Sequence, residues 1–540
     1  MRFLPIYFSL AFLSACYQTE STLTDTLLYC TDKAPISFNP QISHDVASLD
    51  ATTHQLYNRL IKIDPISQHF VSDIASHWTV NKNKTEYTFY LRQDVNFHIN
   101  DYFTPTRNLN ADDVIFSFQR MLSKAHPFHY VNVEKDTYLY NHPFSNLVNK
   151  IIKVDEHTIR FLLNKPDATL LATLAAHYAV IHSKEYAQSL LASGKLEQID
   201  FLPIGTGPYQ FKQNSTERIV RYQAHKTPWE TPVNIEKLIF DITPNSTKRY
   251  AKLLSGECDV ITNPASSQVK KISKNKNVTL SSHPTGKISL IAFNTKNDAL
   301  KDKSIRQAIS RSIDVKTILD AVFFDSATTA SNLLSDTSWA YNPRTEKLNF
   351  SPEASLEKLD LTDFDFTQSL QILAPFKNSI FNPNFYKTAE LIQSNLADIG
   401  VKSEIIQLRN HELHAALLSG DYDIYLTGIS PYIKDPDNLF RPLLSCSSNQ
   451  IEGNTARFCD VKVQRLLDDT LLETDFVQRV KNYYRLQQYT QDQRVYLPIA
   501  HLLRFDVFNK NITGLQMNSL TGINFKAAQK VKPINMEQLQ

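Results

Sequence analysis

A chain of 540 residues is too long for a single hydrophobic core, so we expect two or three domains. Hydrophobic residues make up 42% and charged residues 21%, which excludes a largely disordered chain. The 57 lysines and arginines nearly balance the 55 aspartates and glutamates, and a net charge of +2 excludes nucleic acid as a main partner recognised by charge.

The first residues have the features of an export signal. Arg2 supplies a positive charge, and the apolar stretch at 3–13 is too short to cross a bilayer as a helix. The stretch ends in Leu-Ser-Ala-Cys, which resembles a bacterial lipobox with Cys16 as its lipidated cysteine. We predict a signal peptide at 1–15 and favour lipidation of Cys16 over an ordinary signal peptide. Both interpretations place the mature protein outside the cytosol.

In chain order, the patterns alternate between strands and helices. Residues 85–95 predict a strand, and residues 110–122 predict an amphipathic helix that Asn110 caps. A second strand is predicted at 158–163, followed by a buried helix at 168–181.

The second half of the chain continues this alternation. Apolar residues on one stripe predict a helix over 387–400 that stops at Gly400, and a strand follows directly. Alternating residues at 421–427 predict a half-buried strand. Strands that alternate with helices indicate α/β domains with parallel or mixed sheets.

Export makes the four remaining cysteines informative, because disulfides form in oxidising compartments. Cys446 and Cys459 flank a short segment rich in serine and asparagine, which favours a disulfide that closes this loop. Cys30 and Cys258 would then form the second pair, although four cysteines allow three pairings. A zinc site is the alternative, but CxxC and close Cys/His spacings are missing, so we predict no metal site.

Catalytic motifs are missing from the sequence. It contains no GxSxG, HExxH or GxxxxGK[ST] pattern. The histidines of HELH, at 411 and 414, have a spacing close to that of metal ligands, but a polar surface helix explains them better because no third ligand lies nearby. We therefore expect a binding protein without a cofactor, not an enzyme.

Several segments, in order along the chain, resemble the family 5 extracellular solute-binding proteins of ABC importers. The dipeptide-binding proteins, some of which also carry haem, and the binding proteins of the Sap transporter, linked to resistance to antimicrobial peptides, are the most similar branches. FTPTRNLNADDV, SWAY at 338–341 and RPLLSC at 441–446 most resemble the Sap branch. The segments that carry the family resemblance are YNRLIKIDP, SHWTV, YTFYLRQDVNF, LNADDVIFSFQR, LPIGTGPYQF, RYAKLLSGECDV and IAFNTKNDALKDKSIRQAISRSID.

The resemblance implies an α/β fold of the type II periplasmic-binding-protein kind, with two lobes joined by a hinge that closes on a ligand. By that layout, lobe one combines 24–58, 196–286 and 500–540, and 59–195 form an extra subdomain. Lobe two covers 287–499. The same resemblance supports the two disulfide pairs given above.

Dipeptide-binding members hold the ligand's amino group with an aspartate three positions before the DPD of a GWxxDxxDPD motif. In this sequence the motif aligns from Gly428, and Tyr432 stands where the aspartate belongs. An arginine for the ligand carboxylate precedes an aromatic-NPN motif in those proteins. Here the motif is FNPN at 381–384, Ser379 takes the arginine's position, and Lys377 is the nearest base. The resemblance therefore implies that both anchors for the ligand's ends are lost.

Two interpretations of this loss compete. In the first, Asp435 or Asp437 binds the ligand's ammonium, although an Asp-Pro pair is also a common turn starter. In the second, the protein does not recognise free dipeptide ends, and Tyr432, Phe381 and Tyr341 favour a larger or flatter ligand, such as an antimicrobial peptide or haem. We favour the second interpretation.

We therefore expect a Sap-like substrate-binding component of an ABC importer in the periplasm of a Gram-negative bacterium. It would act as a monomer, with or without a lipid anchor at Cys16, and deliver peptide-like ligands to a permease with its ATPase. The alternatives are a dipeptide-binding or haem-binding protein of the same family, with haem as cargo, and a periplasmic chaperone or surface lipoprotein outside transport.

Overall fold

The mature part of the chain is described almost completely. The predicted signal peptide and Cys16 lie outside this part, so lipidation stays a prediction. No helix of the described part is both long and apolar enough to cross a membrane. The computed structural model describes residues 25–43, 45–132, 144–215, 218–345, 348–448, 451, 453–518 and 520–531.

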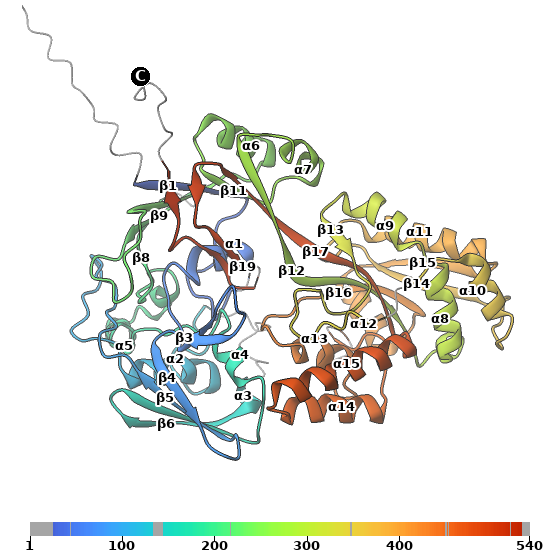
Figure 1. Cartoon of the computed structure of the whole chain (residues 1–540), viewed down its shortest axis with the longest axis horizontal. Coiled ribbons are helices and arrows are strands. Elements are labelled where there is room, and N and C mark those ends of the chain that lie inside the picture. The colour runs from blue at the N-terminus through green and yellow to red at the C-terminus, as the bar shows by residue number, and fades with distance from the viewer. Residues whose placement is uncertain are drawn as a thin grey trace, which may run out of the picture.

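One mixed sheet of eleven strands runs through the molecule, and Figure 1 shows its long strands β12 and β17 joining two bodies. The sheet contains both parallel and antiparallel pairs, which confirms the predicted mixed α/β class. In spatial order the strands are β15 (Lys402–Leu408), β14 (Ser369–Pro375), β16 (Ile424–Ile429), β12 (Val278–Phe293), β17 (Tyr496–Asn509), β11 (Val260–Thr262), β1 (Thr26–Thr31), β10 (Lys237–Ile242), β9 (Ile219–Ala224) and β8 (Tyr209–Ser215), with β13 (Ala327–Thr329) paired to β17.

A second, four-stranded sheet belongs to the first body, at the lower left in Figure 1. Its order is β4 (Ala75–Val80), β5 (Glu86–Leu91), β7 (Thr158–Leu163) and β6 (Val148–Asp155). Three two-stranded pairs complete the strands: β2 (Ile61–Ile63) with β3 (Phe70–Ser72), β18 (Ile512–Thr513) with β21 (Gln529–Lys530), and β19 (Gln516–Asn518) with β20 (Gly522–Asn524).

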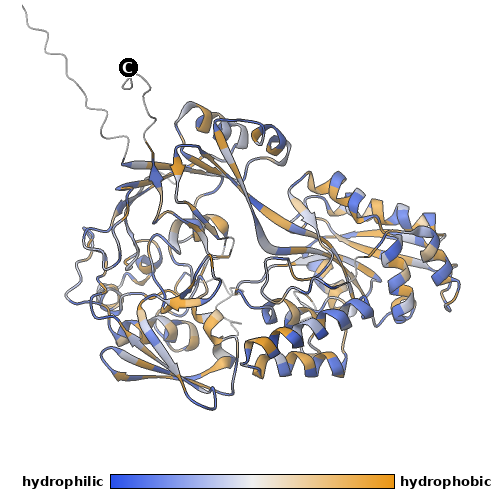
Figure 2. Ribbon diagram, in the orientation of Figure 1, coloured by the Kyte–Doolittle hydropathy of each residue, from blue (hydrophilic) through white to orange (hydrophobic). Residues whose placement is uncertain are grey.

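The helices cover both bodies, and Figure 2 shows separate hydrophobic and hydrophilic stretches along them. The first body holds α1 (Val46–Thr52), α2 (Ala111–Leu122), α3 (Phe144–Leu147), α4 (Leu170–Leu174), α5 (Lys184–Ser193), α6 (Ser246–Ser255) and α7 (Ser266–Ile272). The second holds α8 (Lys303–Ser312), α9 (Val315–Ile318), α10 (Pro352–Leu359), α11 (Phe385–Asp398), α12 (Asn410–Ser419), α13 (Asp437–Leu444), α14 (Val461–Leu472) and α15 (Phe476–Gln493).

Local sequence patterns explain several of these elements. Strand β5 buries every second residue, as its alternation predicts. Asn110 caps α2 in a capping box with Asp113, which satisfies backbone N–H groups that the first turn leaves unpaired. Helix α11 buries the predicted stripe and is followed by Gly400 at φ +75°, a conformation that glycine adopts without strain.

Two sequence predictions are wrong in part, both at largely buried segments: the first extends a helix too far, and the second finds the strand but not its burial. The predicted helix at 168–181 is helical only at α4, after which the chain turns and Val180 forms a bridge to Arg59. The predicted half-buried strand is β16, whose two faces are both buried because it lies between β14 and β12 with a hydrophobic cluster on each side. Periodicity cannot separate these cases when apolar residues are buried in every direction.

Strands β12 and β17 pair along almost their whole length. The ladder runs from Val278, opposite Asn509, to Pro284, opposite Leu503, and resumes at Ile288 after a register shift. Gly286 lies in this shift at φ +72°. The shift adjoins the predicted lobe boundary at 286, and the division into lobes stays a prediction.

A buried ion cluster fixes β17 to the first body. The guanidinium of Arg504 donates to both oxygens of Asp50 at 2.9 and 2.8 Å and to Asp506 at 2.8 Å. The hydroxyl of Tyr29 donates to Asp50 at 2.6 Å. Burial raises the pKa of Asp50, whereas Arg504 lowers it. Residues from β1, α1 and β17 therefore hold one another in place.

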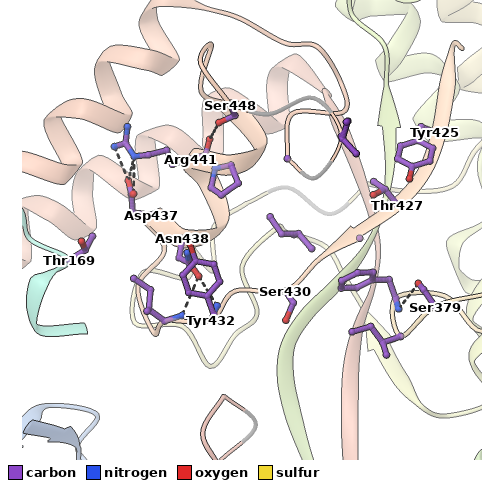
Figure 3. A pocket seen from close by; sticks show the side chains of 18 of the residues that line it. Thr169, Ser379, Tyr425, Thr427, Ser430, Tyr432, Asp437, Asn438, Arg441 and Ser448 are labelled. Atoms are coloured by element: carbon purple, nitrogen blue, oxygen red, sulfur yellow. Dashed lines mark hydrogen bonds and ion pairs between the residues drawn. The ribbon is translucent and has the colours of Figure 1, made fainter. Parts of the chain in front are cut away.

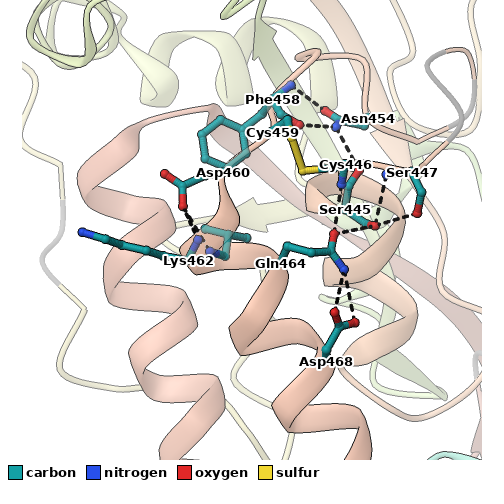
Figure 4. The surroundings of a disulfide bond; sticks show 11 residues. Ser445, Cys446, Ser447, Asn454, Phe458, Cys459, Asp460, Lys462, Gln464 and Asp468 are labelled. Atoms are coloured by element: carbon teal, nitrogen blue, oxygen red, sulfur yellow. Dashed lines mark hydrogen bonds between the residues drawn. A yellow bond between two sulfur atoms is a disulfide. The ribbon is translucent and has the colours of Figure 1, made fainter.

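The structure contains both predicted disulfides, Cys30–Cys258 and Cys446–Cys459. The first pair is fully buried and ties β1 to the residues just before β11. The second closes a loop between α13 and α14, and Figure 4 shows Gln464 of α14 bonded to the loop beside it.

We predict that stability falls on acidification below about pH 6.5. Burial lowers the pKa of His225 and of His501 to about 4, whereas the pKa of a free histidine is about 6.5. The unfolded chain therefore binds these protons first, and each histidine removes about 1.4 kcal/mol of stability per pH unit between those values. Denaturant unfolding across pH 7 to 4.5 measures the slope.

The matched variants are His501→Gln and His69→Gln. A glutamine at 501 can still donate to the carbonyl of Asn332, which lies 3.0 Å from His501 Nε2, but it takes up no proton. His501→Gln should make the pH slope shallower, and His69→Gln, at an exposed position, should not. An equal slope in both variants would contradict the assignment.

Candidate functional site

A cavity of about 1190 Å³ lies where the two bodies face each other. This volume exceeds the range of about 300–1,000 Å³ typical of small-molecule sites. The first body contributes Asn146, Leu147, Lys165, Asp167, Thr169, Thr173 and Tyr178. The second contributes residues of β14, α11, β16, α13 and the loop closed by Cys446–Cys459, among them Lys377, Ser379, Phe381, Tyr425, Gly428, Tyr432, Asp437, Arg441, Ser448, Ile451 and Gly453.

Residues 430–436, here called the cleft loop, connect β16 to α13 and cross between the bodies. Asn438 holds the loop's backbone, since its Oδ1 accepts from the N–H groups of Tyr432 at 2.7 Å and Ile433 at 3.2 Å (Figure 3). Ile433 is buried in the hydrophobic cluster of the first body, and Lys434 Nζ contacts Gln68 Oε1 of that body. The loop therefore forms part of the cavity wall in a fixed conformation.

Asp435 has its carboxylate fully engaged. Both oxygens accept from the guanidinium of Arg479, at 2.6 and 2.8 Å, and one accepts from the hydroxyl of Tyr483 at 3.3 Å. Asp435 is buried and borders a separate, smaller cavity of about 300 Å³ on the other side of the cleft loop. The structure thus gives Asp435 a structural partner in place of the ligand ammonium considered from sequence.

Asp437 lines the large cavity but is also paired. It is the first residue of α13, and Arg441, one turn later, donates to its two oxygens at 2.9 Å each. Burial raises the pKa of Asp437, and the charge of Arg441 lowers it. Arg441 in turn bonds to Asp468 and to the carbonyl of Leu467, so this pair offers a ligand little unused charge.

Tyr432 and Phe381 both line the cavity, as expected of ligand-binding candidates. Tyr432 also packs on the hydrophobic cluster of the first body. Phe381 explains the glycine of the motif, because a Cβ at Gly428 would lie 2.5 Å from Phe381 Cβ. Figure 3 shows Tyr432 and Ser379 on the wall formed by the second body.

The FNPN segment is a helix start as well as a cavity wall. Asn384 caps α11 by accepting from the N–H of Lys387, and Asn382 accepts from the N–H of Asn384 at 2.8 Å. Ser379 and Lys377 precede it on exposed backbone, and both line the cavity. The arginine position of the dipeptide-binding proteins therefore faces this cavity and holds a short hydroxyl side chain.

One ligand-binding candidate, Tyr341, lies away from the cavity. Tyr341 is half-buried on a hydrophobic cluster of the second body and is not among the cavity's lining residues. Its neighbour Trp339 instead packs under the guanidinium of Arg479, 5.3 Å from the ring centre. The histidines at 411 and 414 lie on exposed positions of α12, and the described residues contain no group of three metal-ligating side chains.

The wall from the first body was not predicted from sequence. Lys165, Asp167 and Thr169 follow β7 in a short loop, and the backbone N–H of Ala168 donates across the cleft to the carbonyl of Leu471 at 2.9 Å. Nothing in the local pattern marks this loop, since only the packing of the two bodies brings it to the cavity.

Two bodies joined by long strands, with a large cavity between them, define a solute-binding protein of the type II periplasmic-binding-protein class. Residues 69–450 match the family model for bacterial extracellular solute-binding proteins, family 5, middle region. The chain belongs to this family, which confirms the resemblance and the fold class predicted from sequence. The family is one of solute-binding proteins of transporters and not of enzymes.

Individual relatives cover nearly the full length. The chain is 33% identical to the probable ABC transporter periplasmic-binding protein SapA of Escherichia coli, over 94% of this chain and 92% of that protein. It is 36% identical to heme-binding protein A of Haemophilus influenzae, over 92% and 91%. The dipeptide-binding protein of Escherichia coli is 32% identical, over 94% and 95%.

Solved structures agree with the fold. HbpA2 of Haemophilus parasuis has a TM-score of 0.89 at 35% identity and covers 94% of this chain and 100% of its own. A dipeptide-binding protein of Pseudoalteromonas in complex with Met-Leu has a TM-score of 0.75, also at 35% identity, over 94% and 100%.

We predict that Asp435→Asn destabilises the protein by about 3–5 kcal/mol, because it leaves the guanidinium of Arg479 buried without its counter-ion. Denaturant unfolding measures the loss. The control is the double variant Asp435→Asn with Arg479→Gln, which should lose less than the sum of the single changes. Unchanged stability with lost ligand binding would instead make Asp435 a ligand anchor.

Proposed function

We propose that this protein is the substrate-binding component of an ABC importer and captures peptide-like ligands, as Sap-like binding proteins would. The observation that carries the proposal is the large cavity between the bodies, with Tyr432 and Ser379 at the two positions where dipeptide-binding relatives hold charged ligand ends. A peptide longer than a dipeptide uses the volume and gains affinity from main-chain bonds and apolar contacts.

Haem is the second candidate cargo. The relative named heme-binding protein A is 36% identical over nearly the whole chain. Phe381, Phe385 and Tyr425 are among the side chains that line the cavity, and aromatic side chains suit a flat ligand. A Soret band after incubation with haemin, in stoichiometric amount, would favour haem over peptide.

Its place of action follows from the same proposal. The protein would work in the periplasm of a Gram-negative bacterium, as a monomer that docks on a membrane permease with its ATPase. Lipidation at Cys16 would tether it to the membrane beside that permease. A chaperone or surface lipoprotein outside transport would need neither lobe closure nor a permease.

We predict that native mass spectrometry of protein purified from its host shows a bound peptide longer than two residues. Fragmentation of the released ligand identifies it. The reason is twofold: the cavity of about 1190 Å³ has room for a longer peptide, and the residues that would bind the ends of a dipeptide are replaced. Ordinary dipeptides in stoichiometric amount would contradict the altered pocket.

We also predict that Tyr432→Asp combined with Ser379→Arg creates binding of the dipeptide Met-Leu, because the pair restores a carboxylate and a guanidinium for the zwitterion's two ends. Titration calorimetry with Met-Leu measures the gain, and the unchanged protein is expected to show none. Each single change is the control. If the double variant does not bind Met-Leu, the pocket differs from that of dipeptide-binding relatives at more than these two positions.

A further inference from the structure

The large cavity contains a buried carboxylate that forms no ion pair with any residue that the structure describes. Asp167 lies in the loop between β7 and α4, lines the cavity, and is only 8% exposed. Its Oδ1 accepts from the backbone N–H of Thr169 at 2.8 Å and from the hydroxyl of Thr169 at 2.6 Å. Among the described residues, none donates a hydrogen bond to Oδ2, and none forms an ion pair with Asp167.

Two paired charges of the second body act on Asp167. Asp435 and Arg479 act on the Asp167 carboxyl in opposite directions, and they form their own buried ion pair. Asp437 and Arg441 likewise pair with each other. Burial raises the pKa of Asp167, because it disfavours the charged form of the carboxyl.

The loop that carries Asp167 belongs to the first body and contacts the second body directly. The next residue, Ala168, donates its N–H across the cleft to the carbonyl of Leu471 on α14. Figure 3 shows Thr169, whose N–H and hydroxyl donate to the Asp167 carboxylate, on the same side of the view as Asp437 and Arg441 of the second body. A group bound at Oδ2 would therefore be enclosed between both bodies.

A buried carboxylate without a counter-ion costs several kcal/mol, so a structural role alone would favour an asparagine, which keeps an acceptor for Thr169. The retained charge points to a partner that is absent from the chain. We propose that Asp167, on the first body, binds a positive charge of the ligand. Tyr432, on the second body, stands at the position of the aspartate that has this role in dipeptide-binding relatives, and it carries no charge.

The ligand's charge is an ammonium or guanidinium, from either its N-terminus or a basic side chain. The inference rests on the proposed function, since it takes the cavity as the site of a peptide-like ligand. Apolar wall residues such as Leu147, Phe381 and Leu471 line the same cavity, so the ligand would combine the charge with apolar side chains.

Three pentapeptide amides of the form Phe-Leu-Xaa-Leu-Phe separate the sources of charge. The first has a free N-terminus and norleucine at Xaa, the second is acetylated with lysine at Xaa, and the third is acetylated with norleucine and carries no charge. Titration calorimetry compares their affinities for the full mature protein. We expect at least one charged peptide to bind about 10- to 100-fold more tightly than the neutral one.

The test variant is Asp167→Asn, which removes the charge and keeps an acceptor for Thr169. It should lower affinity for the preferred charged peptide to that of the neutral peptide and leave the neutral peptide's affinity unchanged. The matched control is Asp155→Asn, at an exposed aspartate of the same body that accepts from the N–H of His157 at 2.8 Å. It makes the same change in net charge away from the cavity and should preserve the preference.

The outcomes separate this inference from the proposed function. Equal binding of all three peptides, or a preference that survives in Asp167→Asn, would overturn the inference and leave peptide capture in place. Binding of none of the peptides by the unchanged protein would overturn both. Loss of the preference in Asp155→Asn as well would assign the effect to overall charge and overturn the role of Asp167.

Discussion

The pairing of β12 with β17 is the constraint on which the rest of the molecule depends. These two strands alone run through both bodies in the described part of the sheet, so the relative placement of the cavity's walls follows from their geometry. Arg504 anchors β17 in the first body through Asp50 of α1, while β16 and β13 add to the pair in the second. The ladder has two register shifts, one around Gly286 and one between Ser289 and Leu290, and such irregularities locally bend a strand pair.

The cleft loop shows how one short motif can be structural and functional at once. Asp435 pairs with Arg479, and Asp437 pairs with Arg441. Asn438 accepts hydrogen bonds from the loop's own backbone. Their side chains fix the conformation that presents Tyr432 to the cavity. The two aspartates of the motif therefore have structural partners, and the side chain that the loop presents to the cavity is the aromatic ring of Tyr432. In our proposal, Asp167 on the wall from the first body recognises the charge of the ligand.

Patterns with a local cause were predictable from sequence. The cap of α2 by Asn110, the stripe of α11 and the alternation of β5 depend on neighbours within a few residues, so spacing alone reveals them. The segment 168–181 was misread because a buried apolar run fits a helix, a turn or a bridge equally well. The ion pair of Asp435 joins residues 44 positions apart, and no local rule connects them.

The sequence by itself determined the family and the mixed α/β class, because these depend on the order and identity of residues; by resemblance it also predicted that Tyr432 replaces a ligand-binding aspartate. It also favoured the disulfide pairs, since a short loop limits the partners of Cys446. Only the tertiary structure decided which polar groups are already satisfied and which are not. Asp435 and Asp167 have the same side chain and are both buried, yet Arg479 faces the first closely enough to pair, while the second opens to a cavity. The reason is physical: the state of a charge depends on what folding places within a few ångströms of it.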